Sequence, residues 1–474
     1  MSQDAYLKKY TLLVAAMASF LTPFVGSAIN LAIPAIGKDF GSSAILLSWV
    51  VTGYLLASAV FLVPFGRLAD IIGRKKIFLA GMLFFSLSSL FCGLSRSVEW
   101  LIFFRILQGV GGAMIFGTGM AILTSVYPPQ ERGRVLGITV ATVYAGLSMG
   151  PVLGGLMTHN LGWQSIFYFN FITGLFIVYF TYSKLKGEWA GARGEKFDLA
   201  GSVLYSAGLV MFMYGISSVA NAWWAVYVLL AGIVVMVLFI RYEMKVEYPV
   251  LNMRLFSSNP TFAFSNLAAL INYSATFAAG FLLSLYLQVV IGFNSQTAGL
   301  ILLAQPVIMA LLSPFAGRLS DRVEPRVVSS WGMALTTLGL FFFCFLTAVT
   351  PIWLVMLNLA LLGTGFALFS SPNSNAVMGS VEKRFYGVAS SALGTMRLTG
   401  QAVSMAVVTL AIAFYVGNVK LSPAYSDLLI KSSRAAFIVF TAFCFAGVFA
   451  SLARGNVISR GPAKRTNRRK GKLE

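Results

Sequence analysis

Fourteen long apolar runs divide this chain, and they constrain its fold more than any other feature. The runs lie at roughly 10–32, 45–65, 77–95, 101–124, 135–157, 164–183, 198–218, 223–242, 261–285, 298–315, 327–348, 352–372, 387–416 and 434–454. A helix of about 20 residues crosses the hydrocarbon core of a bilayer. Lipid offers no partner for a free backbone N–H or C=O group, so each run is expected to be helical. The sequence therefore predicts an all-α integral membrane protein with fourteen transmembrane helices.

The composition agrees with a bilayer environment. Of the 474 residues, 58% are hydrophobic and only 11% are charged, whereas a soluble domain carries roughly 25% charged residues. A chain this apolar cannot bury its side chains in one soluble core. Lipid must therefore be the solvent for most of its surface.

Lysine and arginine are unequally distributed between alternate connecting segments. With the N-terminus in the cytosol, 28 of the 35 lie in cytosolic segments and 5 in outer segments, while Arg105 and Arg397 lie within runs. Cytosolic loops of membrane proteins carry an excess of lysine and arginine. We therefore predict a multi-pass protein of the cell membrane with both termini cytoplasmic. The net charge of +20 does not indicate nucleic-acid binding, which would gather basic residues on one face of a folded domain.

A short polar signature occurs twice in the connecting segments. GRLADIIGRKK, which begins at Gly66, returns as GRLSDRVEPR, which begins at Gly317, and the two glycines are 251 residues apart. In each copy a glycine, an arginine and an aspartate stand between two apolar runs. Two copies half a chain apart indicate two related halves, an architecture typical of secondary transporters.

The sequence contains no pattern that predicts catalysis. We find no nucleotide-binding loop, no nucleophile–base set and no zinc-ligand spacing. Cys92, Cys344 and Cys444 all lie in apolar runs, where they are expected to be core residues without disulfides or metal. We therefore predict neither an enzyme nor an energy-driven pump, and no cofactor and no metal.

Further motifs lie along nearly the whole chain. They are WVVTGYLLA from Trp49, RILQGVGGA from Arg105, GLSMGPVLGG from Gly146, YLQVVIGFNSQTAG from Tyr286 and YGVASSALGTMRLTGQA from Tyr386. With the repeated signature, they make the chain resemble the fourteen-span drug/proton antiporter (multidrug efflux) family of the major facilitator superfamily. The signature loop marks the superfamily only. The family's span-five antiporter motif, GxxxGPxxGG, is more specific and is matched at every fixed position by Gly146, Gly150, Pro151, Gly154 and Gly155.

The resemblance implies a fold and a function. It implies the major facilitator fold, with an N-terminal six-helix bundle (1–197), an inserted helix pair (198–243), a C-terminal six-helix bundle (244–454) and a basic cytosolic tail (455–474). The function it implies is secondary active transport by alternating access, with proton-driven export of small amphipathic molecules. The expected partners are the lipid bilayer, a small-molecule substrate and protons, and a monomer is expected.

One departure from the family concerns proton coupling. In span one the family commonly reads LDxTIVNVALP, whereas this chain reads FVGSAINLAIP from Phe24 to Pro34. Val25 occupies the place of an aspartate that is a proposed proton or cation site in the family.

Three interpretations of this departure remain open. An acid at a helix end, such as Asp39 or Asp198, substitutes for the missing carboxylate. Alternatively, the substrate itself carries the proton or the charge, held by Arg105 or Arg397. In the third interpretation the protein is an uncoupled facilitator. We favour the first, because the rest of the antiporter framework is intact.

The two arginines within the runs are candidate cavity residues. Arginine at the bilayer centre costs at least about 2.5–3.5 kcal/mol, so it is expected to face a wet cavity or a partner. Gln108 is one helical turn from Arg105 and is expected to share its face. The alternatives are snorkelling of Arg105 to the outer surface and a bond from Arg397 to backbone carbonyl groups.

The charge of this cavity is expected to be positive. Every Asp and Glu of the chain lies at the end of a run, in a connecting segment or at a terminus, which favours neutral or anionic substrates. Other candidate cavity residues are polar or aromatic, with bonds between helices as the alternative role. They are Asn30, Tyr54, Asn266, Asn272, Tyr273, Phe277, Asn358 and Asn373.

The repeated signature is predicted to form a cytosolic gate. When the cavity faces outward, Asp70 is expected near the start of span thirteen, around Gly387, because a helix N-terminus stabilises an anion. By the pseudo-symmetry, Asp321 is expected near Arg134. Arg74 is expected to pair with Glu131. The candidate gate residues are Gly66, Asp70, Arg74, Glu131, Gly317 and Asp321.

The span-five motif is predicted to form a bendable seam. Gly146, Gly150 and Gly154 recur every four residues and share one helix face, where small residues allow a neighbouring helix to approach closely. Pro151 removes one backbone hydrogen bond and kinks the helix. The alternative is ordinary tight packing.

Two other functions are weighed against proton-coupled export. One is an uncoupled or exchange transporter of neutral or anionic metabolites. The other, a membrane sensor that does not transport, is expected to carry a sizeable soluble domain. The longest segment outside the predicted spans is the short basic tail, which argues against a sensor.

Overall fold

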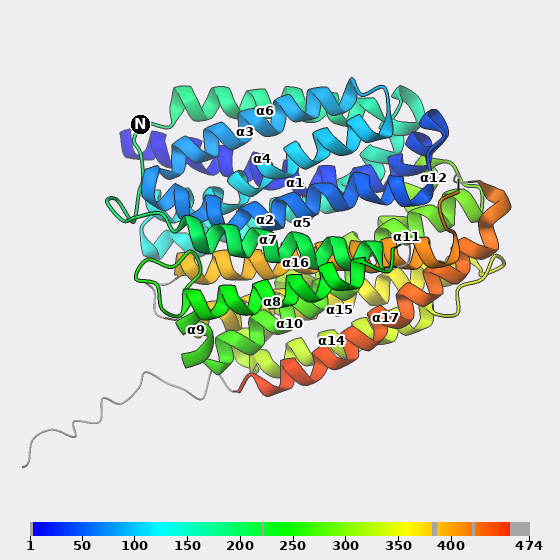
Figure 1. Ribbon diagram of the computed structural model, residues 1–474. Coiled ribbons are helices and arrows are strands. Elements are labelled where there is room, and N and C mark those ends of the chain that lie inside the picture. The colour runs from blue at the N-terminus through cyan, green and yellow to red at the C-terminus, as the bar shows by residue number, and fades with distance from the viewer. Residues whose placement is uncertain (1–2, 220–221, 382–385, 420–421, 456–474) are drawn as a thin grey trace, which may run out of the picture.

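The computed structural model describes residues 3–219, 222–381, 386–419 and 422–455, and within these ranges it is built of helices. In chain order they are α1 (Gln3–Phe40), α2 (Ala44–Ile72), α3 (Arg74–Gly93), α4 (Val98–Val126), α5 (Pro129–Leu161), α6 (Gln164–Lys184), α7 (Leu199–Ser218), α8 (Ala225–Glu243), α9 (Met253–Ser258), α10 (Pro260–Thr276), α11 (Ala279–Leu285), the π-helix η1 (Tyr286–Val290), α12 (Ser295–Leu302), α13 (Ala304–Arg322), α14 (Pro325–Phe343), α15 (Ile352–Gly379), α16 (Tyr386–Tyr415), the 3₁₀-helix η3 (Pro423–Tyr425) and α17 (Ser426–Ala453). The long helices run side by side along one direction (Figure 1).

Capping residues set the starts of several helices. Ser43 accepts a hydrogen bond from the Leu46 amide at the start of α2, at 3.4 Å. Asp198 accepts one from the Gly201 amide at the start of α7, at 2.8 Å. Side-chain oxygens at these positions satisfy amide groups that have no partner within the helix. The polar segments between apolar runs therefore fix where each span begins.

The predicted membrane fold is confirmed. Thirteen helical segments of the described chain are long and apolar enough to cross a membrane, with α10 to η1 and α12 to α13 each forming one segment. The remaining predicted span, 135–157, lies within α5, a helix of 33 residues that packs along α1. The N-terminus and the described end of α17 lie at the same end of the bundle (Figure 1), as an even number of crossings requires.

The helices form two groups with corresponding parts. Helices α1–α6 pack together as the first group, and α10–α17 pack together as the second. The first copy of the repeated signature runs from the end of α2 into α3, and the second runs from the end of α13 into α14. Each copy therefore joins the same pair of helices in its own group.

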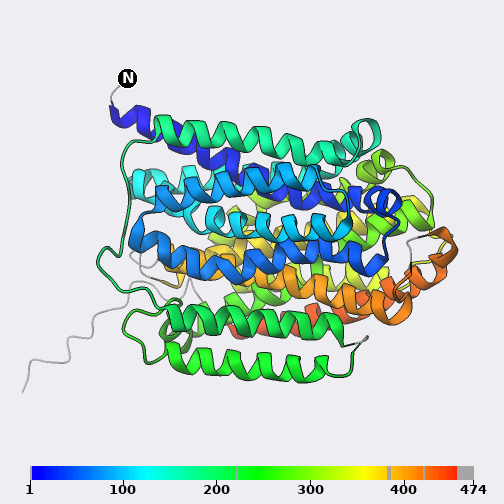
Figure 2. The same ribbon diagram turned by 45° about the horizontal axis from the view of Figure 1, so that its top comes forward.

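The inserted helices α7 and α8 lie together at the edge of the bundle (Figure 2). Helix α7 contacts both α2 and α16, which belong to different groups. The Tyr205 hydroxyl of α7 donates to the Ala59 carbonyl of α2 at 3.0 Å and interacts with Thr399 of α16. Helix α7 thus bridges the seam between the two groups.

Contacts between the two groups include several toward the end opposite the termini, here called the outer end because the distribution of basic residues predicts that it faces outward. Ser284 Oγ donates to the Asn30 carbonyl at 2.6 Å, and Ser295 Oγ donates to the Gly155 carbonyl at 3.1 Å. These bonds join α11 to α1 and α12 to α5. At the inner end, the Asp70 side chain binds Arg74 within its own group. The bonds of Ser284 and Ser295 therefore join the two groups toward the outer end.

Candidate functional site

Arg105 lies inside the helix bundle with its charge fully covered. The residue is 0% exposed, and its Nε donates to the Val50 carbonyl at 3.0 Å. Its guanidinium also donates to Gln108 and stacks over the Tyr54 ring, 4.3 Å from the ring centroid. One guanidinium nitrogen, Nη2, has no hydrogen-bond partner. Arg105 therefore does not snorkel to the surface, and it keeps one donor free.

Arg397 occupies the seam between the two groups. Its guanidinium carbon lies 5.3 Å from the centroid of the Phe116 ring, which belongs to α4 of the first group. On its other side it interacts with Tyr273 of α10. The Arg397 Nε atom is buried without a hydrogen-bond partner. The alternative expected from the sequence was a bond from Arg397 to backbone carbonyl groups, and the Nε atom does not make one.

Aromatic rings surround these arginines. Tyr273 packs edge-on against Phe366, with ring centroids 5.5 Å apart, and the Tyr144 hydroxyl lies 3.4 Å from Ser370 Oγ across the two groups. The rings supply apolar area and their faces attract cations. The arrangement places apolar ring surface beside guanidinium donors.

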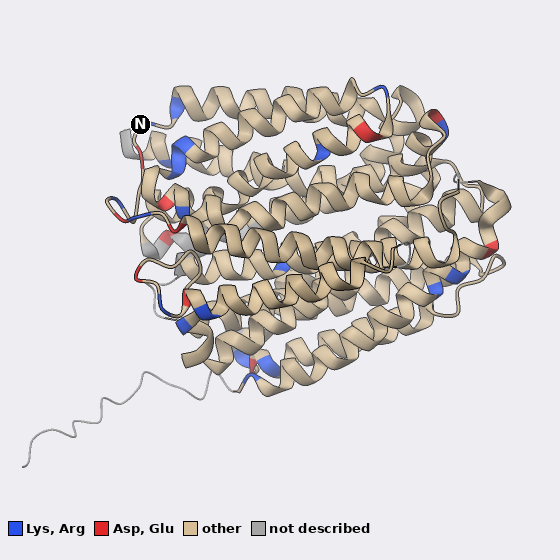
Figure 3. Cartoon of the chain, viewed as in Figure 1, with Lys and Arg blue, Asp and Glu red and all other residues tan. Residues whose placement is uncertain are grey.

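The middle of the bundle carries little negative charge. Figure 3 shows acidic residues at the two ends of the helices, whereas isolated basic bands occur between them. The ion pairs found in the described chain are Lys8–Glu131, Arg67–Glu195 and Arg74–Asp70. None of these acids neutralises Arg105 or Arg397. The electrostatic character of the central site, defined here as Arg105 and Arg397 with the rings of Tyr54, Phe116 and Tyr273, is therefore positive.

The predicted cavity asparagines Asn30, Asn266, Asn272 and Asn358 each have a buried amide oxygen without a hydrogen-bond partner, and Asn272 also lacks one for its amide nitrogen. Asn272 is 0% exposed. One helical turn before Asn30, a Cβ atom at Gly26 would meet no atom within 4 Å. Buried polar groups are normally satisfied by protein, water or ligand, so Asn272 and this face of α1 remain candidate contacts for water or a polar substrate.

Other predicted cavity residues have partners within the helix framework. Asn358 Nδ2 donates to the Gly339 carbonyl at 2.9 Å and ties α15 to α14. Asn373 Nδ2 donates to the Ser265 carbonyl at 3.2 Å, and Asn266 Nδ2 bonds within α10. Phe277 packs, partly buried, against the core. The structure thus does not bring Asn358 and Asn373 together with the two arginines by hydrogen bonds.

Sequence reasoning missed the aromatic partners on the first group. Phe116 follows Arg105 by eleven residues on α4, a spacing of close to three helical turns that places both on one face. That periodicity was available from the sequence. Tyr144 and Ser370 offered no comparable signal, because their approach depends on how α5 and α15 pack.

The gate residues pair differently from the prediction. Arg74 Nε donates to Asp70 Oδ1 at 2.8 Å, and Arg74 Nη1 donates to Ser125 Oγ at 2.7 Å. Glu131 instead accepts from Lys8 Nζ at 2.9 Å. The predicted Arg74–Glu131 pair is therefore wrong for this structure, because each residue has a nearer partner of opposite charge.

The remaining gate positions are glycines or lie outside the described side chains. A Cβ atom at Gly66 would meet no atom within 4 Å, and one at Gly317 would lie 3.0 Å from Ser371 Oγ. Asp321 lies in α13, but its side chain is outside the described residues, as are the side-chain surroundings of Gly387. The contacts predicted for Asp70 with Gly387, and for Asp321, remain predictions.

The span-five motif packs on two neighbours at once. Gly146, Gly150 and Gly154 face α1, where a Cβ atom on any of them would collide with Phe20, Ser27 or Ala28. On another face of α5, Pro151 and Gly155 meet α12. The motif thus lies where the two groups touch toward the outer end.

The three positions discussed for proton coupling have different surroundings. Val25 is 0% exposed and belongs to the apolar core. Asp39 is exposed and accepts a hydrogen bond from Trp163 Nε1 at 2.8 Å. Asp198 is buried at the start of α7.

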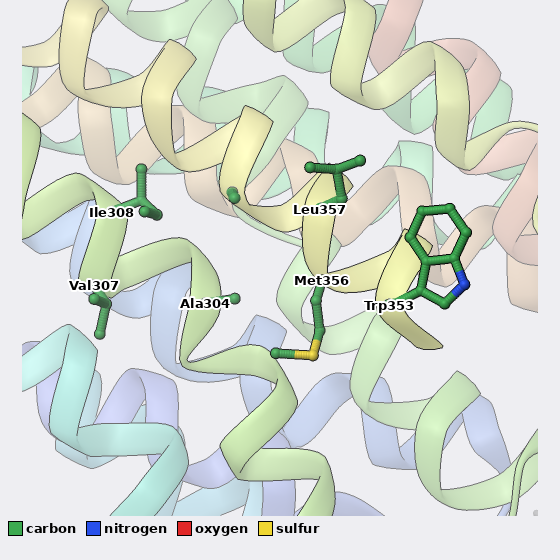
Figure 4. Close-up of a pocket in the computed structure, with 7 residues that line it drawn as sticks. Ala304, Val307, Ile308, Trp353, Met356 and Leu357 are labelled. Atoms are coloured by element: carbon green, nitrogen blue, oxygen red, sulfur yellow. The ribbon is translucent and has the colours of Figure 1, made fainter. Parts of the chain in front are cut away.

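A separate apolar pocket opens between α13 and α15 (Figure 4). It has a volume of about 490 Å³ and is lined by Ala304, Val307, Ile308, Trp353, Met356, Leu357 and Ala360. Trp353 and Leu357 are 66% and 60% exposed, as expected of side chains that face lipid. The pocket contains none of the predicted site residues and offers no ionisable group.

Comparison with known proteins identifies the family of this chain. The family model described as Major Facilitator Superfamily matches residues 15–263 and 265–473. The riboflavin transporter RibZ of Clostridioides difficile (strain 630) is 27% identical over 441 residues, which are 93% of this chain and 96% of that protein. The multidrug resistance protein Stp of Mycobacterium tuberculosis (strain CDC 1551 / Oshkosh) is 30% identical over 402 residues, which are 84% of this chain and 74% of that protein.

The fold also matches a solved structure. A bacterial homologue of the human lysosomal transporter Spinster, in an inward-facing and unoccupied conformation, superposes with a TM-score of 0.70. The match covers 96% of this chain and 99% of that chain, at 17% sequence identity. This likeness supports the helical architecture.

Proposed function

The chain belongs to the major facilitator superfamily and is a secondary transporter, and from this premise we propose that it exports small amphipathic molecules, neutral or anionic, in exchange for protons. The observation that carries the proposal is the pair Arg105 and Arg397. Both guanidinium groups keep an unpartnered nitrogen, and neither is ion-paired to an acid in the described chain.

The position of Arg397 supports a role in alternating access. It belongs to the second group but stacks over Phe116 of the first. A substrate that binds Arg397 therefore touches both halves. A ligand shifts a conformational equilibrium only as far as it binds one state better than the other. A site built from both halves changes when the halves move, so its affinity for the substrate can differ between the two states.

The chemistry of the site favours some substrates over others. Aromatic and apolar walls with a few polar groups suit amphipathic molecules. Guanidinium donors without a neighbouring carboxylate favour carbonyl, carboxylate or phosphate oxygen on the guest. A permanent cation would lose its hydration and meet like charge. Among relatives, one is named for riboflavin and another for multidrug resistance.

Flux in liposomes tests the proposal. Purified protein is reconstituted, and uptake of matched anionic, neutral and cationic dyes is followed with and without a pH gradient. We expect the pH gradient to accelerate the uptake of anionic or neutral dyes. Arg397→Gln should lower their kcat/KM by about tenfold or more, a loss of about 1.4 kcal/mol of binding. Arg96→Gln, at an exposed arginine, is the matched control. Gradient-driven flux of cations alone would contradict the proposal.

An uncoupled or exchange transporter of neutral or anionic metabolites is the second candidate. It is favoured by Val25, a residue that cannot titrate and lies within the apolar core. Proton release on substrate binding separates the two candidates. Release supports coupling, and single neutralisation of Asp39 and Asp198 then asks which carboxylate is responsible. Flux that is indifferent to pH, without proton release, supports the second candidate.

We also propose an orientation and an oligomeric state. Both termini are placed in the cytosol because of the 28 to 5 distribution of basic residues. A monomer is proposed because one chain contains both halves that alternating access requires. The proposed domain division follows the helix groups: 1–197, 198–243, 244–454 and the tail 455–474.

A further inference from the structure

Two carboxyl groups from different helices meet in the protein interior, away from the central site. Asp198 is the N-cap of α7, and Glu243 is the last residue of α8. The two residues are only 9% and 2% exposed. Both face Gly201, where a Cβ atom would collide with Asp198 Oδ2 and with Glu243 Oε1. The two carboxyl groups therefore lie against each other at one end of the α7–α8 pair.

Their hydrogen bonds leave one buried oxygen without a partner. Asp198 Oδ1 accepts from the Gly201 amide at 2.8 Å and from the Tyr242 hydroxyl at 3.3 Å. Glu243 accepts from the Leu251 amide at 3.1 Å and the Val250 amide at 3.4 Å. Asp198 Oδ2 has no donor. Asp198 Oδ2 is thus a buried acceptor that lies beside the carboxyl group of Glu243. One proton shared between the two carboxyl groups would supply its missing hydrogen bond.

In the described chain neither carboxyl group forms an ion pair. The nearby cations Lys196 and Arg254 are exposed, and Arg254 donates to the Met244 carbonyl at 3.4 Å. The acid three residues before Asp198, Glu195, is bound by Arg67. Tyr242 is the other titratable group that acts on the pair, and a phenol is neutral in this range. On α8 and just beyond it, Arg241 and Lys245 are exposed. Two buried carboxylates that share one site cannot both ionise without a large cost in desolvation and repulsion.

We propose that Asp198 and Glu243 bind one proton between them and thereby form a proton-sensitive latch at the end of the inserted helix pair. With the proton in place, Glu243 donates to Asp198 Oδ2 and still accepts from the amides of Val250 and Leu251. The latch then holds the start of α7, the end of α8 and the connecting segment 244–252 together.

Loss of the proton leaves two adjacent negative charges, which separate the two helix ends and release the segment. Helix α7 bridges α2 and α16, so the state of the latch bears on the seam between the two halves. This inference does not depend on which substrate is carried.

Hydrogen exchange of the full-length protein in nanodiscs tests the latch. Amide exchange in segment 244–252 is measured by mass spectrometry from about pH 6 to about pH 9 and corrected for the intrinsic pH dependence of exchange. In the wild type, opening should rise by up to about tenfold per pH unit over the range in which the closed latch holds the shared proton and the open form has released it. Glu243→Gln and Asp198→Asn should each remove this rise, because the new amide N–H replaces the shared proton. Glu247→Gln, at an exposed acid of the same segment, should keep the wild-type behaviour.

Two outcomes would overturn the proposal. One is a wild type whose segment opens equally at all pH values. The other is faster exchange in both single variants at every pH, which would mean that the two groups act as ionised caps. Infrared spectroscopy of the wild type adds a direct measurement. A protonated carboxyl C=O band that persists at neutral pH and disappears in both variants supports the shared proton, and its absence from the wild type contradicts it.

Discussion

At the scale of single residues, buried amide groups separate into two kinds. The Asn358 amide nitrogen donates to a neighbouring helix while its amide oxygen has no partner, whereas Asn272 has no partner for either amide atom. An unsatisfied buried polar group costs about 1–3 kcal/mol. Such a group in a native protein is commonly satisfied by water, an ion or a ligand.

This contrast gives a prediction with an internal control. Asn272→Leu should leave the thermal midpoint unchanged or raise it, because it removes an unsatisfied amide, while transport falls. Asn358→Leu should lower the midpoint, because it leaves the Gly339 carbonyl without its donor. Scanning fluorimetry and liposome flux measure the two quantities. Lower stability together with full transport in Asn272→Leu would show that this amide serves packing.

The surroundings of Val25 bear on the missing carboxylate. Val25 is enclosed by apolar side chains, but the neighbouring Gly26 has open space where a side chain would project. We expect Val25→Asp to be destabilised, because burying a carboxyl without partners is costly. Gly26→Asp should fold and shift selectivity toward cationic dyes. The dye panel and thermal midpoints check both. A shift toward cations in a stable Val25→Asp variant would place position 25 in the cavity after all.

At the scale of helices, glycines decide how closely α5 approaches its neighbours. Gly299 of α12 meets the Pro151 carbonyl of α5 so closely that an added Cβ atom would collide with backbone. This contact joins the two halves. Gly394 of α16 also lies at the seam, but a Cβ atom there would meet Leu62 at an ordinary 3.9 Å.

These two glycines predict different effects of the same substitution. Gly299→Ala should weaken closure at the outer end, because backbone cannot yield as a flexible side chain does. We expect a shift of population toward the outward-open state and a loss of transport of about tenfold or more. Gly394→Ala should leave both unchanged. Spin-label distances across the outer end report the population. Unchanged distances in Gly299→Ala would mean that the α5–α12 contact does not hold the closed state.

At the scale of the whole molecule, the inserted pair decides the orientation of everything that follows it. Trp223 lies in the turn between α7 and α8 and is 76% exposed. Glu247 lies beyond the other end of α8 and is exposed. If both helices cross the membrane, the two positions lie on opposite sides.

Cysteine labelling tests this topology in intact cells. Trp223→Cys should react with an impermeant reagent added outside, whereas Glu247→Cys should react only after the membrane is permeabilised. The basic residues concentrated on the side of Glu247 give the reason for this orientation. The three native cysteines, two buried and one partly buried, provide a low background. The reverse pattern at the two positions would place the termini outside.

The sequence by itself determined the fold class and the arrangement of spans. Long apolar runs leave only helices as structures that lipid permits, and the repeated signature at Gly66 and Gly317 divides the helices into two related groups. It also indicated the buried arginines, because an arginine within an apolar run has few environments that can accommodate its charge. These are properties of short stretches of chain, which the surrounding solvent constrains directly.

Only the tertiary structure decided which polar groups meet. Arg74 pairs with Asp70 rather than Glu131, Phe116 stacks with Arg397, and Asp198 meets Glu243 across a glycine. Arg74 and Asp70 lie only four residues apart, but the other two contacts join segments whose relative rotation and depth arise from the packing of whole helices. Hydropathy fixes that a helix crosses the membrane but leaves its rotation nearly free, because lipid accepts any apolar face. The residues that bind, gate or hold a proton are set by that rotation, so they appear only when the helices are assembled.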